Sequence, residues 1–236
     1  MRKIGITLVG ILVSISIFSQ NLVGAWEATI TTSEGVDIKN VVIFSENYMA
    51  STWFNTKDGE FRSVNGGSWK LNGNTLEGNI EFDSRNSDKV GSQMIFDLII
   101  SESELKVDGV DIVWKKLDNG TPGDLCGAWL MSGRKRDGKI ETRNTDQPRK
   151  TLKILSETRF QWIAYNTETK QFMATGGGSY TTIGSKYKEN IEFFSKDKTR
   201  VGAELSFDFS LLQNEWHHAG FSSKGDPLYE IWSIRE

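Results

Sequence analysis

Short runs in which apolar and polar positions alternate follow one another along most of the chain. In one run Phe160, Trp162 and Ala164 occupy every second position, and in another Leu205 and Phe207 do the same. A period of two is typical of β-strands, and turn-like Lys-Asp-Gly, Asn-Gly-Asn and Asp-Gly sequences separate the runs. The pattern predicts an all-β protein built from hairpins.

This pattern occurs twice, because the sequence contains an internal repeat. Residues 45–69 align with residues 156–180, an offset of 111 positions (156 − 45), and the match continues without a gap to Leu98. Asn-Ile-Glu-Phe stands in both copies, at 79–82 and 190–193, and each copy opens with Gly-Ala-Trp. The second copy is longer at two places, between this Trp and the Ser-Glu pair and before the last strand. Such a match indicates two copies of one structural unit.

Each copy contains eight candidate strands, which in the first copy begin near residues 24, 38, 48, 60, 75, 92, 104 and 111. A unit of roughly 100 residues accommodates eight strands of about six to eight residues joined by short turns. Sequential antiparallel strands close most simply into an up-and-down barrel, which leaves no exposed edge. We therefore expect two tandem eight-stranded antiparallel up-and-down β-barrels, at 21–118 and 125–236, joined by a linker at 119–124.

The N-terminus has a different pattern. Met-Arg-Lys precedes fifteen uncharged residues, 4–18, and small or polar residues follow. This arrangement is typical of a secretory signal peptide, and it is shorter than the about 20 apolar residues that a membrane span needs. No cysteine follows the apolar run to accept the lipid of a bacterial lipoprotein. Residues 1–20 are therefore predicted to be a cleaved signal peptide, which gives a secreted or periplasmic mature chain without a membrane-spanning segment.

Composition narrows the classes of function. The single cysteine, Cys126, rules out an intramolecular disulfide, and with only two histidines it argues against a Cys/His zinc site. The 28 basic and 31 acidic residues give a net charge of −3 without a basic run, which argues against nucleic-acid binding. We predict neither a cofactor nor a metal.

In a barrel, alternate side chains of each strand face the interior, so the more apolar phase predicts the inward set. On the Asn-Ile-Glu-Phe strand this phase places the isoleucine and the phenylalanine of both copies inside. It places Glu81 and Glu192 outside, as surface ion pairs with basic neighbours. The glycine-rich segment 176–178, like 65–67 in the first copy, lies within a strand run and predicts a bulge or a tight bend.

The inward positions of the second copy are more polar than those of the first. At the same offset Leu76 corresponds to Tyr187 and Gly78 to Glu189. A polar group inside a barrel is costly unless it is paired or serves a ligand. These differences predict a filled first barrel and a polar, aromatic-walled ligand cavity in the second. The predicted ligand-binding residues are Arg159, Gln161, Tyr165, Tyr180, Tyr187, Glu189, Trp216, His218, Glu230 and Trp232.

The same polarity also has structural interpretations. Arg159 and one glutamate would form a buried salt bridge, and His218 would be a hydrogen-bonded core residue. A one-residue bulge would turn part of the predicted inward set outward.

Gly-x-Trp on the first strand of each copy resembles the signature of the lipocalin and calycin superfamily. There the tryptophan plugs one end of the barrel and packs near a basic residue of the last strand. The resemblance implies this structural role for Trp26, beside Lys115 or Lys116, and for Trp129, beside Arg235. The Thr-Asp-Tyr motif of typical lipocalins is absent. The chain, especially YKENIEFFSKDKTRVG with WHHAG and EIW, is similar to secreted lipocalin-like proteins of unknown function from Bacteroidota, which implies a ligand-binding barrel and names no ligand.

Three functions fit this sequence. In a small-molecule-binding protein, Arg159 would anchor an anion, and Glu189, His218 and Glu230 would hydrogen-bond polar groups of an unidentified ligand. An enzyme would use the same cavity, with a Glu/His acid–base pair or with His218 and two carboxylates around a metal. A third possibility is an envelope or partner-binding module that acts through its outer surface. The sequence favours the first function over an enzyme and assigns no catalytic residue.

Overall fold

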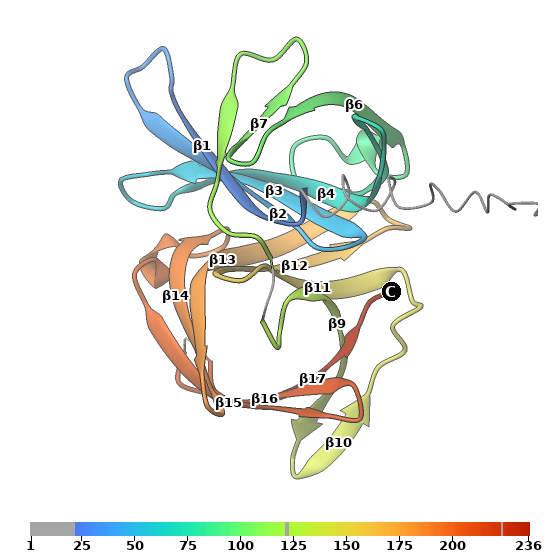
Figure 1. The fold of residues 1–236 in the computed structure, drawn as a ribbon. Coiled ribbons are helices and arrows are strands. Elements are labelled where there is room, and N and C mark those ends of the chain that lie inside the picture. The colour runs from blue at the N-terminus through green and yellow to red at the C-terminus, as the bar shows by residue number, and fades with distance from the viewer. Residues whose placement is uncertain (1–21, 121–122, 223) are drawn as a thin grey trace, which may run out of the picture.

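The computed structural model describes residues 22–120, 123–222 and 224–236, and they form two β-barrels (Figure 1). The first barrel is closed by eight strands in chain order, since β8 pairs with β1. Its strands are β1 (Gly24–Thr31), β2 (Asp37–Phe44), β3 (Tyr48–Asn55), β4 (Phe61–Asn72), β5 (Thr75–Asp83), β6 (Gln93–Ile100), β7 (Glu104–Val107) and β8 (Val113–Lys116).

The second barrel repeats this order and closes by pairing β17 with β9. One further strand, β10 (Lys139–Thr142), pairs with β9 and extends beyond the barrel. The barrel strands are β9 (Gly127–Arg136), β11 (Arg149–Leu155), β12 (Arg159–Asn166), β13 (Gln171–Ile183), β14 (Lys186–Phe194), β15 (Glu204–Leu212), β16 (Glu215–Phe221) and β17 (Pro227–Ile234).

The predicted fold class, two tandem antiparallel barrels, is confirmed. The predicted signal peptide at 1–20 and part of the predicted linker at 119–124 lie outside the described residues. Two short 3₁₀ turns lie at corresponding places of the two copies. They are η1 (Ser87–Lys89), between β5 and β6, and η2 (Lys198–Arg200), between β14 and β15. Within the described ranges, no helix has the length and apolar character needed to cross a bilayer.

A β-bulge interrupts the Asn-Ile-Glu-Phe strand in both copies. Neighbouring glycines of β4, Gly66 and Gly67, pair with Phe82 and Ile80, so Glu81 is an extra residue; β13 and β14 repeat this around Glu192. A Cβ atom on Gly67 would lie 2.0 Å from the Asn79 carbonyl oxygen, which explains the glycine. The bulge predicted from the glycine-rich segments is therefore confirmed.

The bulge changes which side chains face the barrel interior. Ile191 packs in the core of the second barrel, but Phe193 and its counterpart Phe82 belong to a cluster that contains residues of both barrels. The prediction that both phenylalanines face inward is therefore wrong, because it assumed an uninterrupted period of two. They form part of an apolar layer between the barrels instead.

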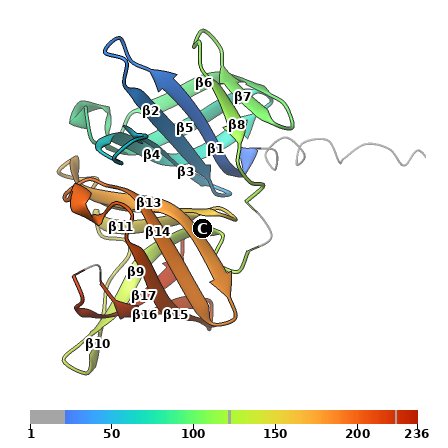
Figure 2. The same cartoon turned by 90° about the vertical axis from the view of Figure 1, so that its left-hand side faces the viewer.

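This layer has the form of an approximate two-fold interface (Figure 2 shows the barrels stacked). Phe54 stacks on Phe193 with ring centroids 4.9 Å apart, and Phe82 packs on Tyr165 at 5.0 Å. The offset of 111 converts Phe54 into Tyr165 and Phe82 into Phe193, so each contact is the counterpart of the other. Phe61 stacks on Phe172, its own counterpart, at 5.8 Å. Such reciprocal contacts define an isologous interface.

Charged groups border the layer, and they correct two expectations. Glu81 accepts hydrogen bonds from Arg235 at 2.9 Å and from the Tyr165 hydroxyl at 2.6 Å, so it is an inter-barrel anchor and not a surface ion pair. The Arg235 guanidinium lies 4.0 Å from the centre of the Tyr48 ring. The implied packing of Arg235 near Trp129 is therefore wrong, because the interface carboxylate holds the arginine.

The tryptophans that open each copy lie in the barrel cores. Trp26 is fully buried and the Lys116 ammonium lies 5.1 Å from its ring centre, as the resemblance implied. Trp129 packs edge-on against Trp216 at 5.8 Å. Both indoles donate to a backbone carbonyl four residues earlier, at 2.9 Å, which fixes them in the same way.

We expect Phe54→Ala to lower the free energy of unfolding by about 3–5 kcal/mol, because it empties a packed site between the barrels. Phe96→Ala is the matched control, since Phe96 lies in the same barrel but is 45% exposed. Equilibrium urea unfolding checks both variants. Equal losses in the two would contradict a stabilising inter-barrel layer.

Candidate functional site

The second barrel contains a cavity of about 320 Å³. Its wall combines charged residues of β11, β14, β16 and β17 with apolar residues of the same and neighbouring strands. The groups that matter for its chemistry are Lys153, Glu189, His218, Glu230, Trp162 and Trp232.

Lys153 is the cavity residue that the sequence interpretation missed. Its Nζ atom donates to Glu189 Oε1 at 2.7 Å, and the two side chains are only 4% and 6% exposed. The offset of 111 aligns Lys153 with Val42, three residues before the repeated segment 45–69. This replacement of valine by lysine is the sequence signal for a cation opposite Glu189.

Aromatic rings surround the Lys153 ammonium. Its nitrogen lies 4.9 Å from the ring centre of Tyr187, 4.8 Å from Trp216 and 5.5 Å from Trp232. Aromatic faces attract cations, most strongly where water is excluded. The cage and Glu189 together compensate for the cost of burying the charge.

His218 and Glu230 form a second polar pair beside the first. His218 Nδ1 lies 3.4 Å from Glu230 Oε2, which also accepts from the Trp232 indole at 3.2 Å. Burial and the nearby Lys153 cation lower the pKa of His218. Burial opposes ionisation of Glu230, but the contacts with His218, Lys153 and Trp232 hold its pKa below the usual value. The pair therefore presents a neutral imidazole and a carboxylate near pH 7.

Several buried polar atoms of this region have no hydrogen-bond partner among the described residues. They are the Tyr187 hydroxyl, the Trp216 indole nitrogen and both ring nitrogens of His218. The Tyr187 hydroxyl is nevertheless close enough to Glu189 for that carboxylate to raise its pKa, after the larger effect of burial. Unsatisfied buried groups are rare in folded proteins and call for a partner such as a ligand.

The first barrel fills the corresponding space mainly with apolar side chains, although the buried Asn40, at the position of Thr151, accepts a hydrogen bond from the Trp114 indole at 2.7 Å. Val42, Leu76 and Trp114 stand where the second barrel has Lys153, Tyr187 and Trp232, and all three lie in its hydrophobic core.

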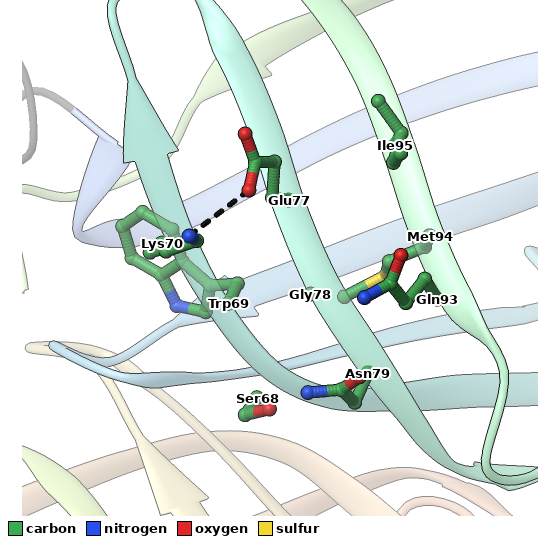
Figure 3. Close-up of a pocket in the computed structure, with 9 residues that line it drawn as sticks. All are labelled: Ser68, Trp69, Lys70, Glu77, Gly78, Asn79, Gln93, Met94 and Ile95. Carbon is green, nitrogen blue, oxygen red and sulfur yellow. Dashed lines mark ion pairs between the residues drawn. The ribbon is translucent and has the colours of Figure 1, made fainter.

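Gly78 occupies the position of Glu189 (Figure 3). A Cβ atom there would lie 2.5 Å from Met94 Cε and 2.1 Å from the Ser68 carbonyl oxygen. Figure 3 shows the Met94 side chain directed towards Gly78, where it takes the space of a side chain. The nearby groove of about 280 Å³ also has the exposed Lys70–Glu77 ion pair in its wall.

Seven of the ten predicted ligand-binding residues lie inside the second barrel. Four line the cavity: Glu189, His218, Glu230 and Trp232. The other three, Tyr180, Tyr187 and Trp216, are packed in the adjoining aromatic core. Tyr180 donates to the Ser156 carbonyl at 2.5 Å, which gives its hydroxyl a structural role. Ligand binding by the other six stays a prediction.

The three predicted residues of β12 face outward, which corrects their assignment to the cavity. Arg159 forms an ion pair with Glu192. Gln161 accepts from Thr52 of the first barrel at 2.9 Å, and Tyr165 lies in the inter-barrel layer. Here the apolar residues Phe160 and Trp162 are the inward phase. The prediction failed because the opposite face is also buried, beneath the other barrel, so both phases look like core.

The carboxylates of the cavity are divided between two partners, Lys153 and His218. Within the described ranges, no group of three or more His, Cys, Asp and Glu side chains is arranged to hold a metal ion.

Lys153→Met should lower the free energy of unfolding by about 3–5 kcal/mol, because it leaves the Glu189 carboxylate buried without its cation. Combining it with Glu189→Leu should recover most of the loss, since a buried ion pair is replaced by apolar groups. Urea unfolding of the single and double variants measures both effects. A double variant with the summed losses of the two single variants would show that the pair is not coupled.

The lowered pKa of His218 predicts pH-dependent stability. Between the folded pKa and the ordinary value of 6.5, the unfolded chain binds the proton and the folded chain does not. Stability from this group is therefore complete above that value and falls on acidification, by up to about 1.4 kcal/mol per pH unit. Unfolding at pH 7.5 and 5.5 should show a smaller pH effect in His218→Gln than in the wild type.

His217→Gln is the control for this measurement, because His217 bonds the Tyr229 hydroxyl at 2.9 Å outside the cavity. An unchanged pH dependence in His218→Gln would reject the assignment.

Comparisons with known proteins add a structural likeness. No protein-family model matches the chain, and no curated protein matches it. One similar solved structure is that of a lipocalin-like protein from Bacteroides uniformis, at 16% sequence identity and a TM-score of 0.35. The match covers 48% of this chain and 100% of the other.

Proposed function

We propose that this protein binds a small organic molecule in the cavity of the second barrel, after export of the mature chain from the cytoplasm. The observation that carries the proposal is the contrast between two copies of one barrel. One copy is filled mainly with apolar side chains, and the other holds two ionisable pairs around a cavity. Stability alone does not favour such groups, because burying charges costs free energy even when they are paired.

The cavity walls suit a ligand with both apolar and polar parts. Trp162, Trp232 and Phe207 supply apolar surface, which gives most of the binding free energy for small molecules. His218 and Glu230 supply polar atoms that fix its orientation. His218 Nδ1 lies nearer to Glu230, so the tautomer with the proton on Nδ1 leaves Nε2 as an acceptor for a ligand hydroxyl or N–H group. The ligand class is therefore a compact amphipathic molecule with at least one hydrogen-bond donor.

A cavity-filling variant tests this proposal with N-phenyl-1-naphthylamine, a neutral aromatic dye that carries one N–H donor. Leu228 lines the cavity, so Leu228→Trp should occupy part of its volume and weaken dye binding by about tenfold or more. Leu212→Trp is the matched control, because Leu212 is 54% exposed on β15. A fluorescence titration measures the affinity. Equal affinity in the two variants would place the dye elsewhere and reject this cavity as its site.

Native mass spectrometry of the exported protein addresses the natural ligand. We expect an adduct on the wild type that is lost when His218→Val and Glu230→Ile install the residue types found at the corresponding positions of the first barrel, Val107 and Ile112. Lys188→Ala with Glu204→Ala removes an exposed ion pair of the same barrel and should keep the adduct.

A further inference from the structure

The cavity adjoins a hollow whose lining includes the β9–β10 hairpin, which has no counterpart among the strands of the first barrel. The segment from Trp129 to Ser156 spans 27 positions, against 19 from Trp26 to Ser45, and it adds the β9–β10 hairpin. The β16–β17 hairpin is also longer than its counterpart, the β7–β8 hairpin, because both of its strands are longer. Both additions meet at a hollow of about 600 Å³ that shares Met131, Leu228 and Glu230 with the cavity. We call this hollow the vestibule.

The added segment that borders the vestibule is basic, although the residues that line the hollow itself include three basic and three acidic side chains. Residues 134–150 contain seven basic and three acidic side chains, although the whole protein has a net charge of −3. Arg134 is neutralised by Glu141, whose Oε2 accepts at 2.8 Å. Lys150 corresponds to Lys39 of the first barrel, but the other basic residues of the segment have no basic counterpart there.

Arg143 is the member of this group that contacts two residues of the cavity wall. Its Nη1 atom lies 3.3 Å from Thr151 Oγ1 and 3.8 Å from Met131 Sδ, and both of these residues line the cavity. Arg143 is half-buried, and in the described part of the chain no carboxylate lies within 4.0 Å of its guanidinium. The contacts of its guanidinium with Thr151 and Met131 are both with neutral groups.

The surroundings of Arg143 favour an added negative charge. Burial lowers its pKa, and the cations of Arg149 and Arg134 lower it further. Glu230 acts in the opposite direction, but that carboxylate is held by His218 and Trp232. A partly desolvated guanidinium beside like charges is stabilised by an anion, which it can bind through charge-assisted hydrogen bonds.

We propose that Arg143, beside the cavity wall, binds an anionic group, so that the ligand of the second barrel is a small amphipathic anion such as an aromatic carboxylate or sulfonate. Its apolar body would lie in the cavity against Trp162 and Trp232, and its charge would lie at Arg143. This inference rests on the proposed function, because it assigns the chemical class of the molecule that the same cavity binds. It also replaces the anion anchor predicted at Arg159 by one on the opposite side of the barrel wall.

Two dyes that differ by one group test the inference. 8-Anilinonaphthalene-1-sulfonate and N-phenyl-1-naphthylamine share the aromatic body and the N–H donor, and only the first carries a sulfonate. In the wild type we expect the anionic dye to bind more tightly, with an affinity that falls as salt is added. Arg143→Gln should weaken the anionic dye about tenfold or more and leave the neutral dye unchanged.

Two further variants control this result. Arg143→Lys keeps the charge and should retain part of the affinity for the anionic dye. Arg62→Gln removes a surface arginine of the first barrel, paired there with Glu60, and should change neither dye. Fluorescence titration gives the affinities, and circular dichroism verifies the fold of each variant.

The outcomes separate the two proposals. Equal affinities of the wild type for both dyes, or an unchanged affinity of Arg143→Gln for the anionic dye, would overturn the anion site. Binding of the neutral dye that Leu228→Trp abolishes would still support the proposed function in that case. Binding of neither dye would count against the cavity as a ligand site and against the anion site with it.

Discussion

The extra residue in each Asn-Ile-Glu-Phe strand decides which side chains fill the barrels and which join them. Without the bulges at Glu81 and Glu192, Phe82 and Phe193 would face inward, where an eight-stranded barrel has little room. With the bulges, both rings lie in the apolar layer between the barrels. The carboxylates of Glu81 and Glu192 lie at the border of this layer, where they pair with arginines. The glycines opposite each bulge are needed because the bulged backbone passes too close for a Cβ atom.

The polar residues inside the second barrel that replace apolar residues or glycine of the first barrel occur in pairs that contact each other. Relative to the first barrel, Val42 becomes Lys153 and Gly78 becomes Glu189, and these two new groups bond each other. Introducing only one of them would leave an unpaired charge in a low-dielectric interior. His218 and Glu230 form a second matched pair, but with a neutral imidazole and with nitrogen atoms left unpartnered. The first pair is therefore the more structural, and the second offers more to a ligand.

The sequence was informative about architecture and the lumen because those depend on local periodicity and on differences between the copies. Barrel closure, the bulged glycine segments and the inward direction of Glu189, His218 and Glu230 could all be predicted in this way.

Contacts between distant segments could not be predicted. Nothing local marks Tyr165 as an inter-barrel residue, because one buried face of a strand has the same apolar pattern whichever neighbour covers it. Arg143 could not be predicted for a related reason. Its contacts with Met131 and Thr151 depend on how the added segment after β9 is placed against the barrel.

The reciprocal ring contacts have a consequence for how such a protein can change. Two identical barrels joined by this interface would form a symmetric dimer, in which any substitution appears on both sides at once. A polar cavity would then cost stability twice. Because both barrels belong to one chain, the interface stays symmetric while the two barrel interiors can differ. The first barrel, with its mainly apolar interior, stabilises the second barrel, whose interior carries the polar groups.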